Sequence, residues 1–300
     1  RQDDGEWRRV SYAQMLDSVR AIAQSLLGYG LSADRPLVLL SGNDIEHLQV
    51  AFGALYAGIP YCPVSPAYSL LSQDFSKLRH VCDLLQPGLV FVSATAAYQR
   101  ALAAVLPADT PLIIVRGQVA GRRQVSFASL LEQSGGAEAE AAFAATGPDS
   151  IAKFLFTSGS TRLPKAVITT QRMLCANQQM LLQTFPVFGE EPPVLVDWLP
   201  WNHTFGGSHN LGIVLYNGGS FYLDDGKPTA QGFAQTLRNL KEVSPTAYLT
   251  VPKGWEELVS ALEQDAQLRE CFFKRVSLFF FAAAGLSQSV WDRLDRVAEQ

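Results

Sequence analysis

The chain has 300 residues, of which 48% are hydrophobic, so we expect a folded globular protein with a large buried core. It carries 24 basic against 28 acidic residues, a formal net charge of −4, and has no basic run, which argues against a nucleic-acid binder. The longest apolar run, around Leu278–Ala284, is far shorter than the ~20 residues of a membrane-spanning helix, so no membrane partner is expected either.

Four scattered cysteines, with no C-x-x-C pair, predict reduced and mostly buried thiols in a cytoplasmic protein without a metal site or a disulfide framework. They are Cys62, Cys82, Cys175 and Cys271. The sequence starts at Arg1, without an initiator methionine or a signal peptide, and stops at Gln300 in a helix-like segment. We therefore expect a fragment of a longer protein, truncated at both ends.

From Pro36 onward, short apolar runs alternate with longer segments of helical spacing. Strands are predicted at 37–40, 59–64, 89–92 and 112–115, and helices at 45–57, 72–85 and 96–106. This alternation is typical of crossover units on a parallel sheet. The strands are continuous apolar runs because helices would cover both faces of such a sheet.

Residues 134–150 are rich in Gly, Ala and Glu, and we interpret them as a linker. The alternation then resumes with helices predicted at 170–185, 233–242 and 255–262. The strands of this half are predicted at 151–156, 194–199, 221–223, 247–251 and 276–282. Together the two halves predict an α/β protein with two sheet-based subdomains.

The most informative segment is an apolar strand that ends at Phe156 and leads into a loop of small hydroxylated residues, followed by Lys165. Hydroxyls and free backbone N–H groups after a strand suit a polyanion, and a lysine adds a mobile positive charge. The spacing is not that of a Walker loop, because no Ser or Thr follows the lysine. From composition alone, a Ser/Thr-rich surface turn is an equally good interpretation.

The run T-S-G-S-T-x-L-P-K resembles the phosphate-binding signature of the adenylate-forming superfamily, which includes acyl-CoA synthetases, peptide-synthetase adenylation domains and luciferases. The resemblance implies that this loop binds the β- and γ-phosphates of ATP and that Lys165 has a catalytic role. The residues given this role are Thr157, Ser158, Gly159, Ser160, Thr161 and Lys165. Arg162 stands where the family usually has glycine, so either crowding or an added phosphate contact is expected there.

A second segment, 198–207, contains a histidine among aromatic residues and ends in a Gly-Gly pair. In the superfamily, a proline, an aromatic residue and a histidine followed by glycine stand at this place. The resemblance implies that His203 is a catalytic residue that lines the acyl pocket and closes the carboxylate-binding region before CoA enters. Trp201 and Phe205 are expected to bind substrate, with ordinary core packing as the alternative.

The third segment, 279–287, is an apolar strand that ends in small residues. Small side chains at the carboxyl end of a strand let a flat ring approach the backbone, although they also permit tight helix–sheet packing. By resemblance to the small-residue segment of the family, we expect Ala283, Ala284 and Gly285 to face the adenine and the acyl group.

The amino-acid sequences of segments 171–179, 197–207 and 222–229 resemble those of feruloyl-CoA synthases in particular. This implies the acyl-CoA-synthetase N-terminal core, with a layered αβαβα arrangement and without the C-terminal domain. Within a partial AMP-binding core over 1–300, we expect a first subdomain at 36–190 and a second at 191–300, which 1–35 joins.

The implied activity is a two-step ligation that uses ATP, Mg²⁺ and coenzyme A. A carboxylic acid such as ferulate forms an acyl-adenylate with release of pyrophosphate, and the CoA thiol then displaces AMP. This chain is expected to hold only part of the machinery. Two alternatives stay open: an adenylating enzyme that passes the acyl group to a carrier protein or to oxygen, and a non-catalytic or degenerate nucleotide-binding fragment.

Overall fold

The computed structural model describes residues 5–157 and 163–299. The chain divides into two compact units, and the boundary in the sequence falls between Met173 and Leu174. This division falls inside α7 (Gln171–Thr184), whereas the sequence predicted subdomains of 36–190 and 191–300. The N-terminal helix α1 (Tyr12–Leu27) belongs to the first unit, unit 1, because its apolar face packs there.

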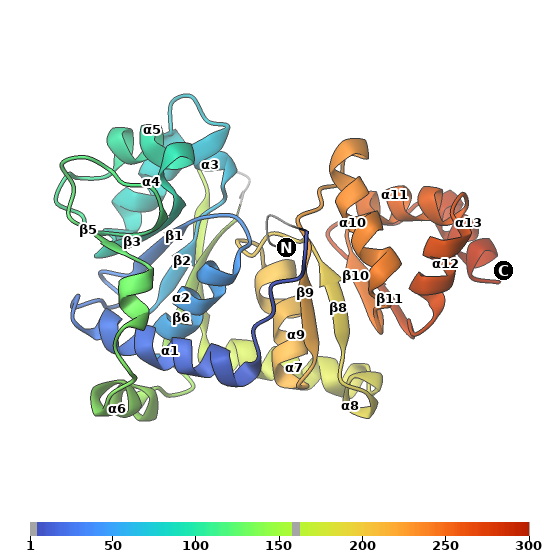
Figure 1. The fold of residues 1–300 in the computed structure, drawn as a ribbon, viewed down its shortest axis with the longest axis horizontal. Helices are drawn as coiled ribbons and strands as arrows, with labels where there is room; N and C mark the ends of the chain where they lie inside the picture. Colours follow the sequence, from blue (N-terminus) through green and yellow to red (C-terminus); the bar gives the residue numbers. More distant parts are fainter. Residues whose placement is uncertain (1–4, 158–162, 300) are drawn as a thin grey trace. The chain divides into compact units, whose positions relative to one another are not determined.

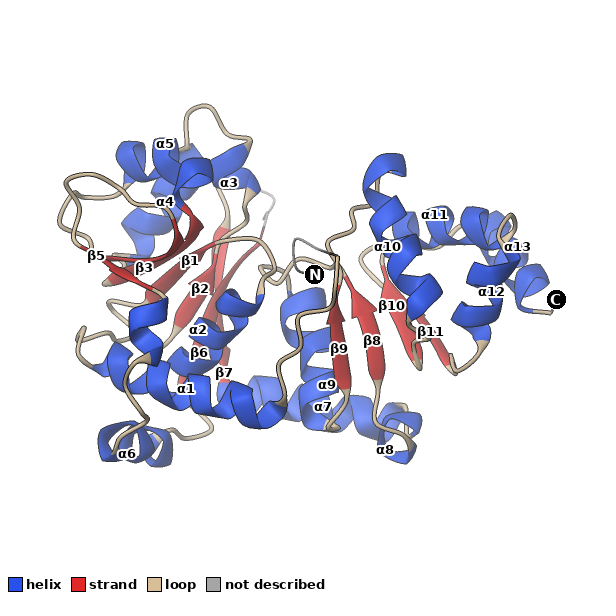
Figure 2. Ribbon diagram, viewed as in Figure 1, coloured by secondary structure: helices blue, strands red, loops and turns tan. Residues whose placement is uncertain are grey.

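In the described part of unit 1, seven strands form one sheet in the order β5-β4-β3-β1-β2-β6-β7, in which only β7 runs antiparallel to its neighbour (Figure 2). The strands are β1 (Leu37–Leu40), β2 (Tyr61–Pro63), β3 (Leu89–Ala94), β4 (Leu112–Arg116), β5 (Gln124–Ser126), β6 (Ile151–Thr157) and β7 (Lys165–Thr170). The parallel sheet confirms the alternation that the sequence predicted.

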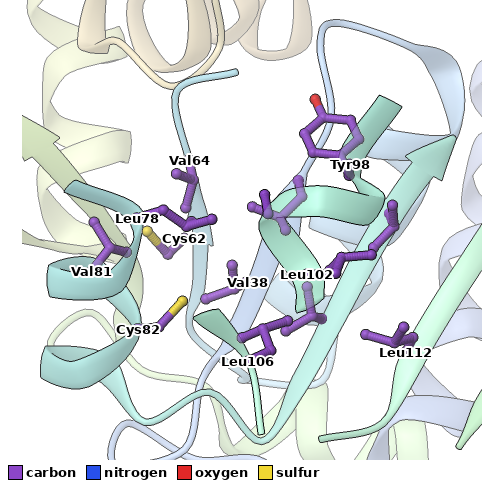
Figure 3. Close-up of a cluster of buried hydrophobic side chains, with 14 of the residues drawn as sticks. Val38, Cys62, Val64, Leu78, Val81, Cys82, Tyr98, Leu102, Leu106 and Leu112 are labelled. Carbon is purple, nitrogen blue, oxygen red and sulfur yellow. The ribbon is translucent and has the colours of Figure 1, made fainter. Parts of the chain in front are cut away.

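Helices cover both faces of this sheet (Figure 1). Alternate residues of β1 show the division: Val38 and Leu40 pack among α4 (Ser76–Leu85) and α5 (Thr95–Val105), as Figure 3 shows for Val38. On the opposite face, Leu37 and Leu39 pack among α1 and α2 (Ile45–Tyr56). No residue of β1 is more than 1% exposed, which explains why the strand is wholly apolar.

Helix α1 is held on α2 by close packing. Its start has a capping box, in which Ser11 Oγ accepts from Gln14 N at 3.2 Å and Gln14 Oε1 accepts from Ser11 N at 2.9 Å. Further along, the fully buried Ile22 lies against Gly53 of α2. A Cβ on Gly53 would lie 2.5 Å from Ile22 Cγ2, so the two helices approach each other over a glycine.

The segment 134–150, interpreted above as a linker, contains the helix α6 (Ala137–Ala145), so that interpretation was wrong. Alanine and glutamate, which suggested a linker, are also strong helix formers. The helix is tied to α1 because Gln24 accepts from Ala139 N at 3.2 Å and donates to Glu138 at 2.8 Å. Unit 1 also contains the short helical segments α3 (Ala67–Leu70) and η1 (Ala128–Leu131). The short helix α8 (Val187–Glu190) belongs to unit 2.

The second unit, unit 2, contains two parallel strand pairs, β8 (Val194–Asp197) with β9 (Ser220–Leu223) and β10 (Ala247–Thr250) with β11 (Leu278–Phe281). The pairs adjoin where Thr246 N donates to Val194 O at 3.0 Å. A π-helix, η2 (Phe205–Asn210), follows β8 and continues into α9 (Leu211–Tyr216). The other helices are α10 (Ala230–Glu242), α11 (Pro252–Leu262), α12 (Ala266–Phe273) and α13 (Gln288–Ala298).

The cysteines follow the prediction only in part. Cys62 and Cys82 are buried, whereas Cys175 is exposed and Cys271 is partly exposed. Across the described residues, every helix is too short or too polar to span a bilayer.

We predict that Gly53→Ala destabilises the protein by about 1–3 kcal/mol, because the added methyl group meets the stiff branched side chain of Ile22. The higher helix propensity of alanine offsets only about 1 kcal/mol of this cost. Urea denaturation measures the change. Gly147→Ala is the control, because a Cβ there has no atom within 4 Å. Equal stability of the two variants would contradict the packing described for α1 and α2.

Candidate functional site

The predicted phosphate loop connects the two strands of a hairpin. In the antiparallel pair β6–β7, Thr157 is the register partner of Lys165. Side chains of paired residues lie on the same face of a sheet, so the hydroxyl and the ammonium group stand side by side where the loop leaves and re-enters the sheet. Both side chains are exposed. The predicted residues Ser158, Gly159, Ser160 and Thr161, and also Arg162, lie outside the described residues.

The end of this hairpin connection is held by a histidine that the sequence analysis missed. The Nε2 atom of His80, on α4, lies 3.0 Å from the carbonyl oxygen of Pro164. Because a carbonyl oxygen only accepts, Nε2 must carry the proton. The contact fixes the backbone immediately before Lys165. His80 is far from the loop in sequence, so no local pattern could have identified it.

In unit 2, His203 lies in a turn between β8 and the π-helix. Its backbone N–H donates to Pro200 O at 3.1 Å, and its carbonyl oxygen accepts from Gly207 N at 2.9 Å. The side chain of His203 is exposed. The backbone on both sides of the histidine is therefore fixed, while the imidazole is free to meet a ligand.

The Gly-Gly pair after this turn is required by close backbone packing. A Cβ on Gly206 would lie 2.5 Å from Leu199 O, and one on Gly207 would lie even closer to Trp201 O. Neither oxygen can move away easily, because both belong to the main chain. The π-helix thus packs directly on the turn that carries His203. π-Helical turns of this kind occur frequently at functional sites.

Three aromatic rings meet beside the π-helix. Phe205 and His209 lie on successive turns with ring centroids 5.3 Å apart, and both contact Phe280 of β11, at 5.8 Å and 5.2 Å respectively. All three are partly buried. We call Phe205, His209 and Phe280 the aromatic cluster. The structure therefore brings one predicted substrate-binding residue, Phe205, next to the strand that leads to the small-residue segment.

Trp201, the other aromatic residue predicted to bind substrate, is only 3% exposed. Its ring packs on Phe221 of β9 at 6.2 Å between centroids. This contact is of the core-packing kind that was considered as the alternative.

The small-residue segment follows the carboxyl end of β11, three residues after Phe280. Ala283, Ala284 and Gly285 are all exposed. Ala283 has φ 76°, a left-handed conformation that costs an alanine about 1–2 kcal/mol. Gly285 has no atom within 4 Å of a built Cβ. The space beside this backbone is open, as a flat ligand would need.

Two buried carboxylates stand at the ends of neighbouring strands in unit 2. Asp197, 3% exposed, ends β8, and its Oδ1 accepts from Leu199 N at 2.9 Å while its Oδ2 accepts from Asn210 Nδ2 at 3.0 Å. Asp224, after β9, accepts from Thr236 Oγ1 at 2.5 Å and from Asn239 Nδ2 at 2.9 Å. Burial raises the pKa of Asp197 to about 7, and it also raises the pKa of Asp224.

The predicted residues therefore fall into two groups that the structure describes separately. Thr157 and Lys165 belong to unit 1, and Trp201, His203, Phe205 and 283–285 belong to unit 2. Within residues 5–157 and 163–299, no three His, Cys, Asp or Glu side chains are placed to hold a metal ion. The sequence analysis also missed Asp197 and His209, although a charged residue that ends an apolar run was a usable signal.

Solved structures resemble this fold. MatB from Rhodopseudomonas palustris with ATP bound has a TM-score of 0.75 and 20% sequence identity, over 100% of this chain and 56% of that chain. A malonyl-CoA ligase complex with methylmalonyl-CoA and AMP has a TM-score of 0.73 and 22% identity, over 99% of this chain and 55% of that one. This likeness confirms the α/β fold with a mainly parallel sheet of the N-terminal part of adenylate-forming enzymes.

The chain belongs to the family of AMP-binding enzymes, whose pattern matches residues 2–300. A long-chain-fatty-acid–CoA ligase of Rattus norvegicus is 23% identical over 297 residues, 95% of this chain and 40% of that protein. A second ligase of this type, from Mycobacterium bovis, is 25% identical over 88% of this chain and 42% of its own length. The chain thus spans about two fifths of these curated relatives.

We predict that Asp197 makes the protein less stable as the pH rises from about 4 to about 7. Its pKa is raised from 3.8 to about 7, so in this window the folded state binds more protons than the unfolded state. The unfolding free energy of the native protein should fall relative to that of Asp197→Asn across the window and stay level above it. Urea denaturation of both proteins at several pH values measures the difference. A constant difference would contradict the raised pKa.

Proposed function

We propose that the whole protein activates a carboxylic acid with ATP to give an acyl-adenylate and then forms an acyl-CoA thioester. The observation that carries this proposal is the family match over 2–300 together with the hairpin that places Thr157 and Lys165 at the ends of the signature loop. The named relatives support it, because the solved structures include complexes with ATP, AMP and methylmalonyl-CoA.

In this reaction the carboxylate attacks the α-phosphorus of ATP, pyrophosphate leaves, and the CoA sulfur later replaces AMP on the acyl carbon. Lys165 neutralises charge on the phosphates, and the neighbouring hydroxyl of Thr157 donates a hydrogen bond to a phosphate oxygen. His203 orients the acid carboxylate from a fixed turn. Mg²⁺ bound with the nucleotide would neutralise phosphate charge. Among the described residues, however, no group of three His, Cys, Asp or Glu side chains is placed to hold this ion.

A hydroxycinnamate such as ferulate is our first candidate for the acid. The aromatic cluster supports it, because Phe205, His209 and Phe280 meet in edge-on and stacked arrangements of the kind that aromatic side chains also make with a flat ligand. The sequences of segments 197–207 and 222–229 resemble those of feruloyl-CoA synthases, and this resemblance favours the same class of acid.

A long-chain fatty acid is the second candidate, since the curated relatives named above are ligases for such acids. Pyrophosphate exchange with ferulate, palmitate or malonate separates the classes. We expect ferulate to support the fastest exchange. Faster exchange with palmitate would overturn the hydroxycinnamate assignment, and no exchange with any acid would favour a degenerate nucleotide binder. Thioester formation with CoA then excludes a carrier protein as the acyl acceptor.

We predict that Lys165→Ala raises the KM for ATP in the exchange reaction with little change in the melting temperature. The side chain is exposed, and a lost charge-assisted contact to phosphate should cost about 1.5–3 kcal/mol. Lys274→Ala, which removes an exposed lysine at the end of α12, is the matched control. An unchanged KM for ATP would remove Lys165 from the phosphate site.

We predict that His203→Ala impairs acyl-adenylate formation more strongly than ATP binding, because the imidazole is assigned to the acid carboxylate. Because the side chain is exposed, its truncation should leave the turn folded. Nucleotide titration and pyrophosphate exchange on the same variant measure the two effects. An equal loss in both assays, with a lowered melting temperature, would show that the residue has a structural role.

A further inference from the structure

The aromatic cluster is connected to the buried carboxylate of Asp197 by a single amide. Asn210, the last residue of the π-helix, is fully buried. Its Nδ2 donates to Asp197 Oδ2 at 3.0 Å and lies 3.4 Å from Leu249 O, while its Oδ1 lies 2.9 Å from His209 Nδ1. The amide therefore joins the end of β8 to the imidazole of His209.

The hydrogen-bonding partners determine the orientation of this amide. An ionised carboxylate accepts only, and so does the main-chain carbonyl of Leu249 on the same side. Both require the nitrogen of Asn210, which leaves the amide oxygen for His209. An amide oxygen also only accepts, so Nδ1 of His209 must carry the proton. Because burial lowers the pKa of His209, the ring is neutral and its Nε2 has no proton.

Among the described residues, none forms a hydrogen bond with Nε2 of His209. The ring is stacked on Phe280 with planes 29° apart, and Phe205 meets its edge. An unprotonated nitrogen thus lies within an apolar cluster that is partly exposed. Such a nitrogen is a hydrogen-bond acceptor for an O–H or N–H group of a flat ligand.

We propose that Asp197 and Asn210 are positioning residues that keep His209 as its Nδ1–H tautomer, so that Nε2 accepts a hydrogen bond from the ring hydroxyl of the aromatic acid. The proposal rests on the proposed function, because it takes the aromatic cluster as the place of the acyl group. It makes His209 a residue that distinguishes a hydroxylated ring from an O-methylated one. A site built to accept a hydroxyl proton disfavours an analogue that lacks this proton.

The test exploits the isosteric change Asp197→Asn. Oδ1 at this position still has to accept from Leu199 N, so the new NH₂ group faces Asn210. The amide of Asn210 then has to turn over to present its oxygen, at the expense of the long contact to Leu249 O. Its nitrogen now faces His209 Nδ1, which becomes an acceptor, and the proton moves to Nε2. The variant should therefore switch the tautomer of His209.

Nitrogen-15 NMR of the protein with ¹⁵N-labelled histidine shows directly which ring nitrogen of His209 carries the proton. The sequence has four histidines, and His209→Gln identifies the signal of His209. At pH 8, above the pKa of about 7 of Asp197, we expect Nδ1–H in the native protein and Nε2–H in Asp197→Asn. Asp224→Asn is the matched control, because this carboxylate is as deeply buried but bonds Thr236 and Asn239, and it should leave Nδ1–H unchanged.

An Nε2–H signal in the native protein would overturn the proposal even if Asp197→Asn fails to fold, and an unchanged tautomer in a folded variant would also overturn it.

The recognition step is tested with ferulate against 3,4-dimethoxycinnamate in pyrophosphate exchange. We expect the native protein to prefer ferulate roughly tenfold in kcat/KM, the effect of one hydrogen bond, and the preference to shrink in Asp197→Asn. No preference in the native protein would refute the role of Nε2. Activation of palmitate but of neither aromatic acid would instead refute the proposed substrate class, and the NMR result would stand independently.

Discussion

Burial of the parallel strands on both faces is the constraint on which the rest of unit 1 depends. No residue of β1 is more than 1% exposed, and Leu89–Val92 of β3 are fully buried. Side chains that bind a polar ligand have no place within such strands, because an unpaired polar group there would lose its hydration. They are therefore confined to the ends of strands and to the connections. Thr157 ends β6 and Lys165 begins β7, which is why the candidate phosphate site forms at one end of the hairpin.

Three titratable groups that are nevertheless buried have specific partners. Lys153 of β6 lies with its ammonium 5.8 Å from the centre of the Tyr61 ring, and burial lowers its pKa to about 8. His47 is paired with Ser41 at 2.7 Å. In unit 2, Asp197 is held by a backbone N–H and by an amide. Each of these groups would be costly in any other arrangement, so each favours one packing of the elements around it.

The sequence predicted β1, β2, β3, β4 and β6 of the sheet, since an apolar run between turn residues has few other uses. It missed the three-residue edge strand β5, which has no buried residue. It did not predict β7 either, because Lys165–Thr170 has no fully buried residue and lacks the apolar pattern of a central strand. It also missed α6, where the composition suited both a helix and a linker. The roles proposed for Lys165 and His203 came from local motifs. His80 and His209 could not be identified in this way, because their contacts join segments far apart in the chain or depend on the hydrogen-bond direction of one amide. Asp197 was missed although it ends an apolar run.

The two candidate sites are held in place by different physical means, and this affects how each one can respond to its ligand. The ends of the phosphate loop are set by strand register and by one side-chain contact, from His80 to Pro164. The turn with His203 is instead enclosed: Asp197 binds its beginning through Leu199 and the following helix through Asn210, and Gly206 and Gly207 leave no space between helix and turn. In the proposed reaction a carboxylate has to attack along one line, which requires groups whose positions are fixed before it arrives, and the backbone of the His203 turn is fixed in this way.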